Sequence, residues 1–267
     1  MDSVPKVRET TMYQEIGYET AGDVGVITLR RPEARNALTF TTYRELEEAV
    51  RGTTARCLII TGADPAFCSG DDVKVVMASA SGKAATAKLE PRLTPAADAI
   101  LNSDTPVIAA VNGAAVGWGM ELALMADLRV ASEKARFGEL FIKRGLCCDV
   151  PGLGRLAQLV GRERAAELLL TGDIIDASEA LRIGLVSRVV PHAQLMQAAM
   201  ELAKKVAANP PLAARRIKQG LRRALDPDWR ELGAWVSTSL SELFKTEDHQ
   251  EGVRAFLEKR EPKFAGR

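Results

Sequence analysis

Two short apolar segments, each followed by a glycine-containing loop and a predicted helix, constrain the fold of this chain most. The first unit covers 57–74, where the run CLIIT ends before Gly62 and Gly70 precedes the helix. The second covers 106–121, where PVIAAV ends at Asn112–Gly113. N–H groups at a helix start lack intrahelical acceptors, and the helix dipole there favours negative charge. The two units therefore predict backbone sites for a negative oxygen, although the first unit alone is equally consistent with an ordinary turn.

Strand-like and helix-like patterns alternate over the first 190 residues or so. Their type follows from the period of the apolar residues and from the glycine and proline residues that end them. Strands are predicted at Val24–Leu29, Cys57–Thr61, Pro106–Val111, Leu128–Ala131 and Leu185–Val190, and helices at Thr41–Val50, Thr86–Leu101 and Glu121–Ala126. Such alternation predicts an α/β fold with covered sheets, although the sequence shows no clean repeat period.

The pattern changes after Pro191, where only helices are predicted. Prolines at 210–211 and 227 mark the breaks between them, because proline ends one helix and can begin the next. The predicted helices are Gln194–Ala207, Leu212–Leu225, Trp229–Phe244 and Glu247–Lys259. We therefore divide the chain into a core, 1–195, and a C-terminal helical region, 196–267. This region is expected to pack on a partner subunit, and a lid over the same subunit's core is the alternative.

The charge balance excludes some functions. The chain has 36 basic and 35 acidic residues, a net charge of +1, which gives no general attraction to nucleic acid or to an anionic membrane. No apolar run approaches the roughly 18–20 residues that span a bilayer. The N-terminus lacks the apolar stretch of a secretory signal, so we expect a cytoplasmic protein. The four cysteines fit neither a disulfide framework nor a zinc site, and we expect reduced, buried thiols.

Other catalytic classes lack their ingredients in this sequence. There is no Gly-x-Ser-x-Gly motif, and the two histidines, His192 and His249, lie outside both glycine loops. His192 follows a proline at a predicted helix start, where a structural cap is expected. Cys68 lies beside the first loop, but a packed thiol is favoured over a nucleophile. The zinc motif His-Glu-x-x-His is absent.

Several stretches together resemble the enoyl-CoA hydratase/isomerase (crotonase) superfamily, and they cover nearly the whole chain in order. They are Arg31–Leu38, Ala66–Asp72, Val111–Leu122, Leu170–Asp173 with Ala177–Ala180, and Glu251–Arg260. The resemblance implies a crotonase-like spiral of ββα units, a homotrimer or dimer of trimers, and an acyl-CoA thioester as substrate. It implies no metal or other cofactor, because coenzyme A enters as part of the substrate.

The resemblance also assigns residues to the site. Two backbone N–H groups, those of Asp71 and Trp118, would hold the thioester carbonyl oxygen as an oxyanion hole. Residues implied for the coenzyme A and substrate are Arg35, Ala37, Leu38, Ala66, Ser69, Gly70, Asp72, Lys74, Gly117 and Phe141. Lys74 is equally consistent with a solvated surface lysine.

The proton carriers depart from the family pattern. Glu121 occupies the position of the family's first catalytic carboxylate, but a structural role at the helix start is the alternative. Phe141 stands where hydratases usually carry the second carboxylate. Asp149 resembles the aspartate of the branch that includes dienoyl-CoA isomerases, so Glu121 and Asp149 are the expected acid–base pair. The alternative for Asp149 is a helix cap. Glu139 is a weaker substitute, for which an exposed position is favoured.

Both oxyanion-hole residues replace small residues of the family. Trp118 is expected to narrow or redirect the acyl pocket. The Asp71 carboxylate would oppose an oxyanion, so it is expected to point away from the thioester. The sequence therefore predicts an enoyl-CoA hydratase, with an enoyl- or dienoyl-CoA isomerase as the alternative. The alternative of another class is a non-catalytic acyl-CoA-binding or scaffold protein.

Overall fold

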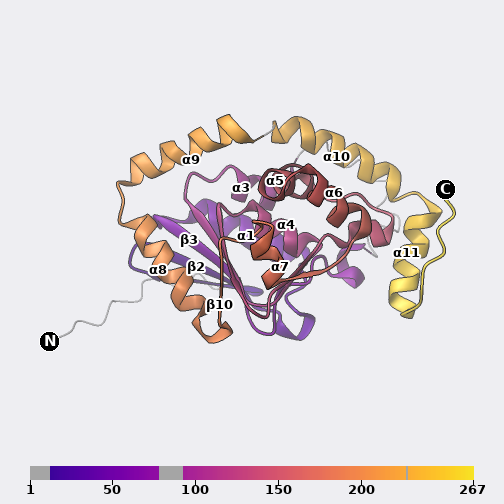
Figure 1. The fold of residues 1–267 in the computed structure, drawn as a ribbon, viewed down its shortest axis with the longest axis horizontal. Helices are drawn as coiled ribbons and strands as arrows, with labels where there is room; N and C mark the ends of the chain where they lie inside the picture. The colour runs from indigo at the N-terminus through magenta and orange to yellow at the C-terminus, as the bar shows by residue number, and fades with distance from the viewer. Residues whose placement is uncertain (1–12, 78–92, 227) are drawn as a thin grey trace.

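The strands of this chain form two β-sheets, and helices pack around them (Figure 1). The computed structural model describes residues 13–77, 93–226 and 228–267. A six-stranded sheet contains, in spatial order, β1 (Ile16–Ala21), β2 (Val24–Leu29), β3 (Cys57–Gly62), β5 (Val107–Val111), β7 (Leu128–Ser132) and β10 (Arg188–Val190). A four-stranded sheet contains β4 (Ala66–Cys68), β6 (Ala114–Val116), β8 (Arg136–Gly138) and β9 (Ile175–Asp176). Pairing is antiparallel for β1–β2 and β8–β9 and parallel elsewhere.

Successive strands enter the two sheets in turn. The chain passes from β3 to β4, from β5 to β6 and from β7 to β8, so each pair contributes one strand to each sheet. A parallel ladder then requires a crossover before the next pair, and helices supply two of these connections. This alternation is the spiral of ββα units that we expected. It brings the ends of β4, β6 and β8 to one edge of the smaller sheet.

Helices cover one face of the larger sheet and enclose the main core. They are α1 (Phe40–Gly52), α3 (Pro95–Leu101), α4 (Trp118–Met125), α5 (Val150–Val160), α6 (Arg162–Thr171) and α7 (Ala177–Arg182). The start of α1 is fixed by a capping box, in which the Thr39 hydroxyl accepts the N–H groups of Thr41 and Thr42. All eight residues of α4 are buried, which explains why its sequence is apolar on every side.

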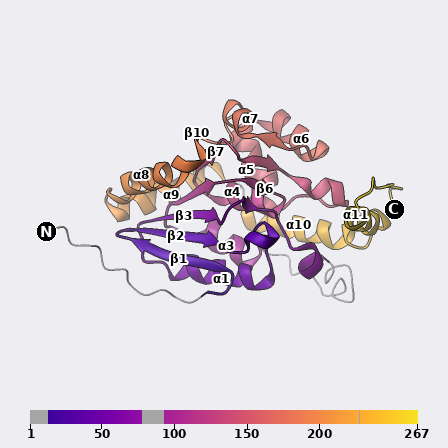
Figure 2. The same cartoon turned by 90° about the horizontal axis from the view of Figure 1, so that it is seen from below.

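The opposite face of the larger sheet is covered by α8 (Leu195–Ala207). Its buried residues, at four-residue intervals from Leu195 to Ala207, pack against Ile59 of β3 and Ile108 of β5, and Figure 2 shows the helix beside these strands. Side chains of a strand alternate between its faces, so Leu58 belongs to the main core while Ile59 faces α8. By its packing α8 is part of the core, although it falls in the helical region that we predicted from residue 196.

The remaining helices extend over the outside of the molecule in Figure 1: α9 (Pro211–Leu225), α10 (Trp229–Leu243) and α11 (Glu247–Glu258). The amine of Lys218 attaches α9 to the core, 2.9 Å from the Thr105 carbonyl oxygen and 2.7 Å from an Asp127 carboxylate oxygen. Large apolar side chains elsewhere on α9 are exposed. Within the described ranges, no helix is both long and apolar enough to cross a membrane.

The predicted elements agree with the structure wherever the apolar pattern was strong. The four C-terminal helices and β2, β3, β5 and β7 lie within about two residues of their predicted bounds. The last strand is shorter than predicted and begins at Arg188. Of the predicted helix Thr86–Leu101, the part from Pro95 is α3, and 86–92 lie outside the described residues.

Candidate active site

The two glycine loops lie against each other. Gly70 has a positive φ of +86°, and a Cβ built on it would lie 2.9 Å from the Val116 carbonyl oxygen and 3.3 Å from the Trp118 nitrogen. Only glycine combines this backbone conformation with so close an approach. The end of β4 and the start of α4 are therefore adjacent, and the backbone of Asp71 follows directly.

The N–H groups of Asp71 and Trp118 remain available at this junction. Trp118 is the first residue of α4, so its N–H has no acceptor within the helix. Asp71 pairs with Leu38 as an isolated bridge, but the bonds of that bridge use the N–H groups of Leu38 and Asp72. In the described part of the chain, neither N–H has a hydrogen-bond acceptor. Two free donors at the start of a fully buried helix are suited to a negative oxygen.

A small cleft of about 10 Å³ lies at these two amides. Its lining contains six of the residues that we assigned to the substrate site, together with two that we did not. The eight residues are Ser69, Gly70, Asp71, Gly117, Trp118, Leu140, Phe141 and Arg144. Trp118 and Phe141 put two large aromatic side chains on its wall. That Trp118 narrows or redirects the acyl pocket stays a prediction.

The Asp71 side chain is held beside the cleft by Tyr43. The Tyr43 hydroxyl donates a hydrogen bond to Asp71, and its ring packs edge-on against Trp118 with 4.7 Å between the ring centroids. Burial raises the pKa of Asp71 to about 6, with repulsion from Asp149 in the same direction and the Tyr43 hydrogen bond and Arg144 opposing. We expected this carboxylate to point away from a thioester. One oxygen is turned to Tyr43, yet the group stays within the electrostatic reach of Asp149.

Glu121 is fully buried one turn into α4. Its Oε1 accepts the Asp149 N–H at 2.9 Å, and its Oε2 accepts the Gly152 N–H at 2.7 Å. Burial raises the pKa of Glu121 well above its usual range, repulsion from Glu139 and Asp149 adds to this, and the two N–H groups oppose it. Glu121 therefore ties the first turn of α5 to α4, whatever further role its carboxyl has.

Asp149 caps helix α5 and also lies beside Trp118. Its Oδ1 accepts the Val150 N–H at 2.7 Å, so the capping role that we considered as an alternative is present. Burial raises the pKa of Asp149, while hydrogen bonds from Val150 and from the Trp118 indole N–H lower it. A cap and a proton carrier are compatible, because a carboxylate has about four acceptor positions.

Glu139 is buried, which contradicts its predicted exposure. It follows β8 directly, and 0% of the residue is accessible to solvent. Burial raises the pKa of Glu139 well above its usual range, and repulsion from Asp149 adds to the effect. The sequence pattern missed this because one polar residue between a short strand and an apolar turn looks like an exposed corner. Glu121, Glu139 and Asp149 thus form a group of neighbouring carboxyls that cannot all be charged at once.

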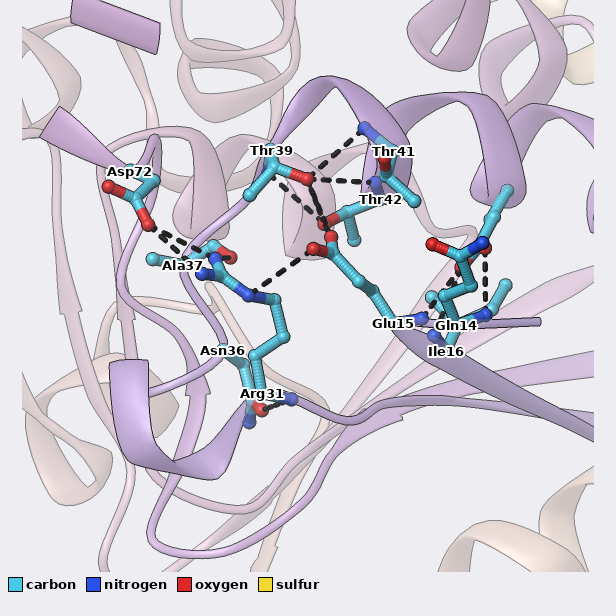
Figure 3. Close-up of polar contacts among 11 residues, drawn as sticks. Gln14, Glu15, Ile16, Arg31, Asn36, Ala37, Thr39, Thr41, Thr42 and Asp72 are labelled. Carbon is cyan, nitrogen blue, oxygen red and sulfur yellow. Dashed lines mark hydrogen bonds and ion pairs between the residues drawn. The ribbon is translucent and has the colours of Figure 1, made fainter. Parts of the chain in front are cut away.

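Arg31 joins the predicted coenzyme A segment to the first loop, as Figure 3 shows. Its guanidinium donates to the Ala37 carbonyl oxygen at 2.6 Å and lies 3.1 Å from an Asp72 carboxylate oxygen. It also lies 3.5 Å from the Glu15 carboxylate, which accepts the hydroxyl of Thr39 at 2.6 Å. The network fixes the chain before α1 against the loop that carries Asp71.

The other residues assigned to coenzyme A differ in their exposure. Arg35 and Lys74 are exposed, whereas the side chains of Ala37, Leu38 and Ala66 are buried, so these three offer only backbone groups to a ligand. Asp72 is paired with Arg31 and is not free to bind a ligand through its carboxylate.

A chain of Ser132, His192 and Asp64 resembles a hydrolase triad but lacks an accessible nucleophile. The Ser132 hydroxyl lies 3.0 Å from His192 Nδ1, and His192 Nε2 lies 3.1 Å from an Asp64 oxygen. Ser132 is 0% exposed and its hydroxyl accepts the Lys134 N–H, so no substrate can reach it. Burial raises the pKa of Cys68 to about 12, which keeps its thiol protonated. No cluster of potential metal ligands occurs among the described residues.

Sequence reasoning missed Tyr43, Arg144 and Arg31 as parts of this site. Arg144 lines the cleft, and its guanidinium lies over the Phe256 ring at 4.6 Å. Tyr43 and its partner Asp71 are separated by 28 residues, and Arg31 and Asp72 by 41. No local pattern signals such pairs, because they form only when segments far apart in the sequence pack together.

Comparisons with known proteins show the family to which this chain belongs. The sequence profile of the family described as Enoyl-CoA hydratase/isomerase matches residues 19–267. The chain is 38% identical to the short-chain-enoyl-CoA hydratase of Clostridium acetobutylicum, over 91% of this chain and 94% of the relative. It is 39% identical to the 2,3-dehydroadipyl-CoA hydratase of Escherichia coli, over 91% of this chain and 95% of the relative.

Solved structures show the same architecture. An enoyl-CoA hydratase/isomerase of Pseudoalteromonas atlantica superposes with a TM-score of 0.84 at 28% identity, covering 94% of this chain and 100% of the other. A carnitinyl-CoA hydratase of Mycobacterium avium superposes with a TM-score of 0.79 at 34% identity, covering 96% and 100%. The spiral of ββα units is therefore shared along nearly the full length of these chains.

Proposed function

Because this chain belongs to the enoyl-CoA hydratase/isomerase family, we propose that it adds water across the 2,3-double bond of an enoyl-CoA thioester. The observation that carries the proposal is the pair of free N–H groups, those of Asp71 and Trp118, at a cleft backed by buried carboxyls. The similar proteins named as hydratases support the same reaction.

The two N–H groups would act as an oxyanion hole. Attack of water on the β-carbon moves negative charge onto the thioester oxygen and gives an enolate. Preorganised donors stabilise such a charge without reorganising during the reaction, and one donor typically contributes about 3–4 kcal/mol at the transition state. The helix dipole of α4 adds to the effect at Trp118.

Glu121 and Asp149 are the proposed proton carriers. One must take a proton from water while a proton is delivered to the α-carbon, and neighbouring carboxyls of raised pKa are suited to both steps. Phe141, at the position of the second carboxylate in hydratases, has no such group. Asp149 supports the second candidate function, an enoyl- or dienoyl-CoA isomerase, because it resembles the aspartate of that branch.

A panel of enoyl-CoA esters of increasing chain length tests this proposal. Loss of the conjugated-enoyl absorbance reports turnover, and mass spectrometry distinguishes hydration, which adds one water, from isomerisation, which leaves the mass unchanged. Glu121→Gln and Asp149→Asn should each lower kcat by about 10²–10⁴-fold, whereas the exposed control Glu163→Gln should match the wild type. No turnover of any ester would reject the proposal, as would wild-type kcat in Glu121→Ala.

Tight binding of coenzyme A esters without turnover would favour a non-catalytic acyl-CoA-binding or scaffold protein instead. Proton transfer beside an oxyanion hole requires no redox cofactor, so we propose that none is used apart from the coenzyme A of the substrate. The exposed apolar side chains Ile217, Leu221 and Leu225 on α9 support a homo-oligomer, a trimer or a dimer of trimers, built by 196–267. The cytoplasmic location stays a prediction.

A further inference from the structure

Glu139 differs from the other two carboxyls in having no hydrogen-bond partner. Both of its side-chain oxygens are buried and unpaired within the described structure. The preceding residue, Gly138, accepts the Gly117 N–H at 2.9 Å, so Glu139 is anchored beside the loop that carries Trp118. Buried polar groups without partners are rare, and each calls for a physical or functional reason.

The hydrogen bonds of the three carboxyls determine which of them keeps a proton. Glu121 accepts two backbone N–H groups, and Asp149 accepts one backbone N–H and the indole N–H of Trp118. Such donors stabilise the charged form of a carboxyl. Glu139 accepts none, and an unpaired buried charge is far more costly than a neutral acid. The proton shared by this group therefore resides on Glu139.

The described surroundings of Glu139 hold no positive charge that would stabilise its ionised form. A cavity of about 280 Å³ adjoins it, lined otherwise by Phe141, Ile142, Leu146, Cys147, Cys148, Leu153, Ala166, Leu169 and Leu170. The titratable groups that face it are Glu121 from α4, Asp149 from the start of α5, and the Cys148 thiol. All three are acidic. No basic side chain of the described residues acts on it.

We propose that Glu139 stores the proton for the reaction and passes it to Asp149, in place of the carboxyl that Phe141 lacks. This inference rests on the function proposed above. Glu139 does not contact the substrate and acts only through Asp149, which transfers the proton to the substrate. Glu139 is therefore a positioning residue, not a catalytic one. Phe141 lines the cleft that contains the two amides. Glu139, two residues earlier, lines only the cavity on the other side of Phe141.

The protons and electrons balance over one hydration. The Glu121 carboxylate takes a proton from water as the bond from oxygen to the β-carbon forms, and the electrons of the double bond move onto the thioester oxygen. Asp149, having received the Glu139 proton, delivers it to the α-carbon as the enolate collapses. The proton on Glu121 then returns to Glu139. The net change is the addition of one water, without an oxidant or reductant.

The test compares two variants of Glu139 with the control Glu163→Gln. Glu139→Gln keeps the shape but cannot carry the proton, and Glu139→Leu also removes the unpaired polar atoms. Both should lower kcat on the order of 10²-fold with KM within about threefold, although Glu139→Leu should unfold at the same or a higher temperature. The alkaline limb of the wild-type pH–rate profile should disappear in both, because it reports loss of the proton from Glu139.

Exchange of the α-hydrogens of butyryl-CoA with solvent deuterium separates this inference from the hydratase proposal. It requires proton transfer but no hydration, and both variants should slow it as they slow kcat. If the wild type catalyses exchange but not hydration, only the hydratase proposal is rejected. The exchange rates of the two variants would then still test the role of Glu139. Absence of both reactions would reject both. A Glu139→Leu enzyme with rates within about threefold of wild type, or an unchanged alkaline limb in Glu139→Gln, would overturn the proton store.

Discussion

Asp71 has two opposing effects on the same cleft. Its N–H group points to the place where a negative oxygen would develop, whereas its carboxylate puts a negative charge nearby. The Tyr43 hydrogen bond and the positive charge of Arg144 reduce this conflict, but burial and Asp149 still raise the pKa of Asp71 to about 6 from 3.8. The side chain is therefore neutral in the folded protein over a range of pH in which it is charged in the unfolded chain.

This difference predicts how stability depends on pH. Because the pKa is raised in the folded state, the contribution of Asp71 is fully present below about pH 4 and is lost as the pH rises through about 6. Asp71→Asn keeps a hydrogen-bond acceptor for Tyr43 without the ionisation. Its unfolding temperature should therefore nearly equal that of wild type at pH 4 and exceed it by on the order of 2–4 °C at pH 8.

Thermal unfolding of the two proteins at both pH values provides the measurement. Asp173→Asn is the matched control, because Asp173 is exposed and its replacement should leave the difference from wild type independent of pH. A constant difference between Asp71→Asn and wild type from pH 4 to pH 8 would contradict the raised pKa of Asp71.

At this scale the sequence identifies residues whose role depends on the backbone and misses those whose role depends on tertiary contacts. Glycines that interrupt an apolar pattern predicted the two loops, and the family resemblance assigned Asp71 and Trp118 within them. The burial of Glu139 could not be predicted, because it depends on α4 and the start of α5 closing over one polar residue. Tyr43 was missed for the same reason, since it lies on α1 and its partner Asp71 lies on the loop after β4.

At the scale of elements, the site depends on how closely α4 approaches β4. A Cβ built on Gly119 would lie 2.1 Å from the Cys68 carbonyl oxygen and 2.7 Å from its carbonyl carbon. Both atoms belong to the backbone, so a side chain at Gly119 cannot be accommodated by a rotamer change. The same contact sets the separation between the Trp118 and Asp71 amides.

Gly119→Ala should therefore lower both stability and activity. The helix must shift away from β4, and a displacement of about 1 Å in catalytic geometry can lower the rate on the order of 10²-fold. Denaturant unfolding and kcat on the preferred enoyl-CoA ester measure the two effects. Gly52→Ala is the control, because no atom lies within 4 Å of its added Cβ and the residue is exposed at the end of α1. Equal activity of Gly119→Ala and Gly52→Ala would show that the close approach is not needed.

The elements that could be predicted are those that bury a continuous apolar run. β3 and β5 are buried on both faces, and their sequences are apolar at nearly every position. In contrast, β4, β6 and β8 have three residues each, which is too short for a recognisable period. β1 pairs at the edge of the larger sheet and has partly exposed polar residues, so its pattern resembles a loop.

At the scale of the whole molecule, α9 contacts the core by polar groups while it exposes apolar ones. The buried amine of Lys218 faces the core, and Arg222 also binds there through the Ser103 carbonyl oxygen. Ile217, Leu221 and Leu225 are each more than half exposed and recur every four residues, so they form one stripe along the helix. A contiguous apolar stripe on an outer helix is typical of a protein interface, and we propose that this stripe forms the contact between subunits.

Replacing two residues of the stripe should therefore dissociate the oligomer. In Ile217→Glu/Leu221→Glu the charges would be buried without partners on assembly, which costs several kcal/mol for each subunit contact. Light scattering coupled to size-exclusion chromatography should give the mass of a trimer or hexamer for wild type and that of the monomer for the double variant. Arg223→Glu, an exposed change on α9 outside the stripe, should leave the mass unchanged. A monomeric wild type, or an intact oligomer of the double variant, would show that the stripe does not form the interface and would leave the lid as the alternative for 196–267.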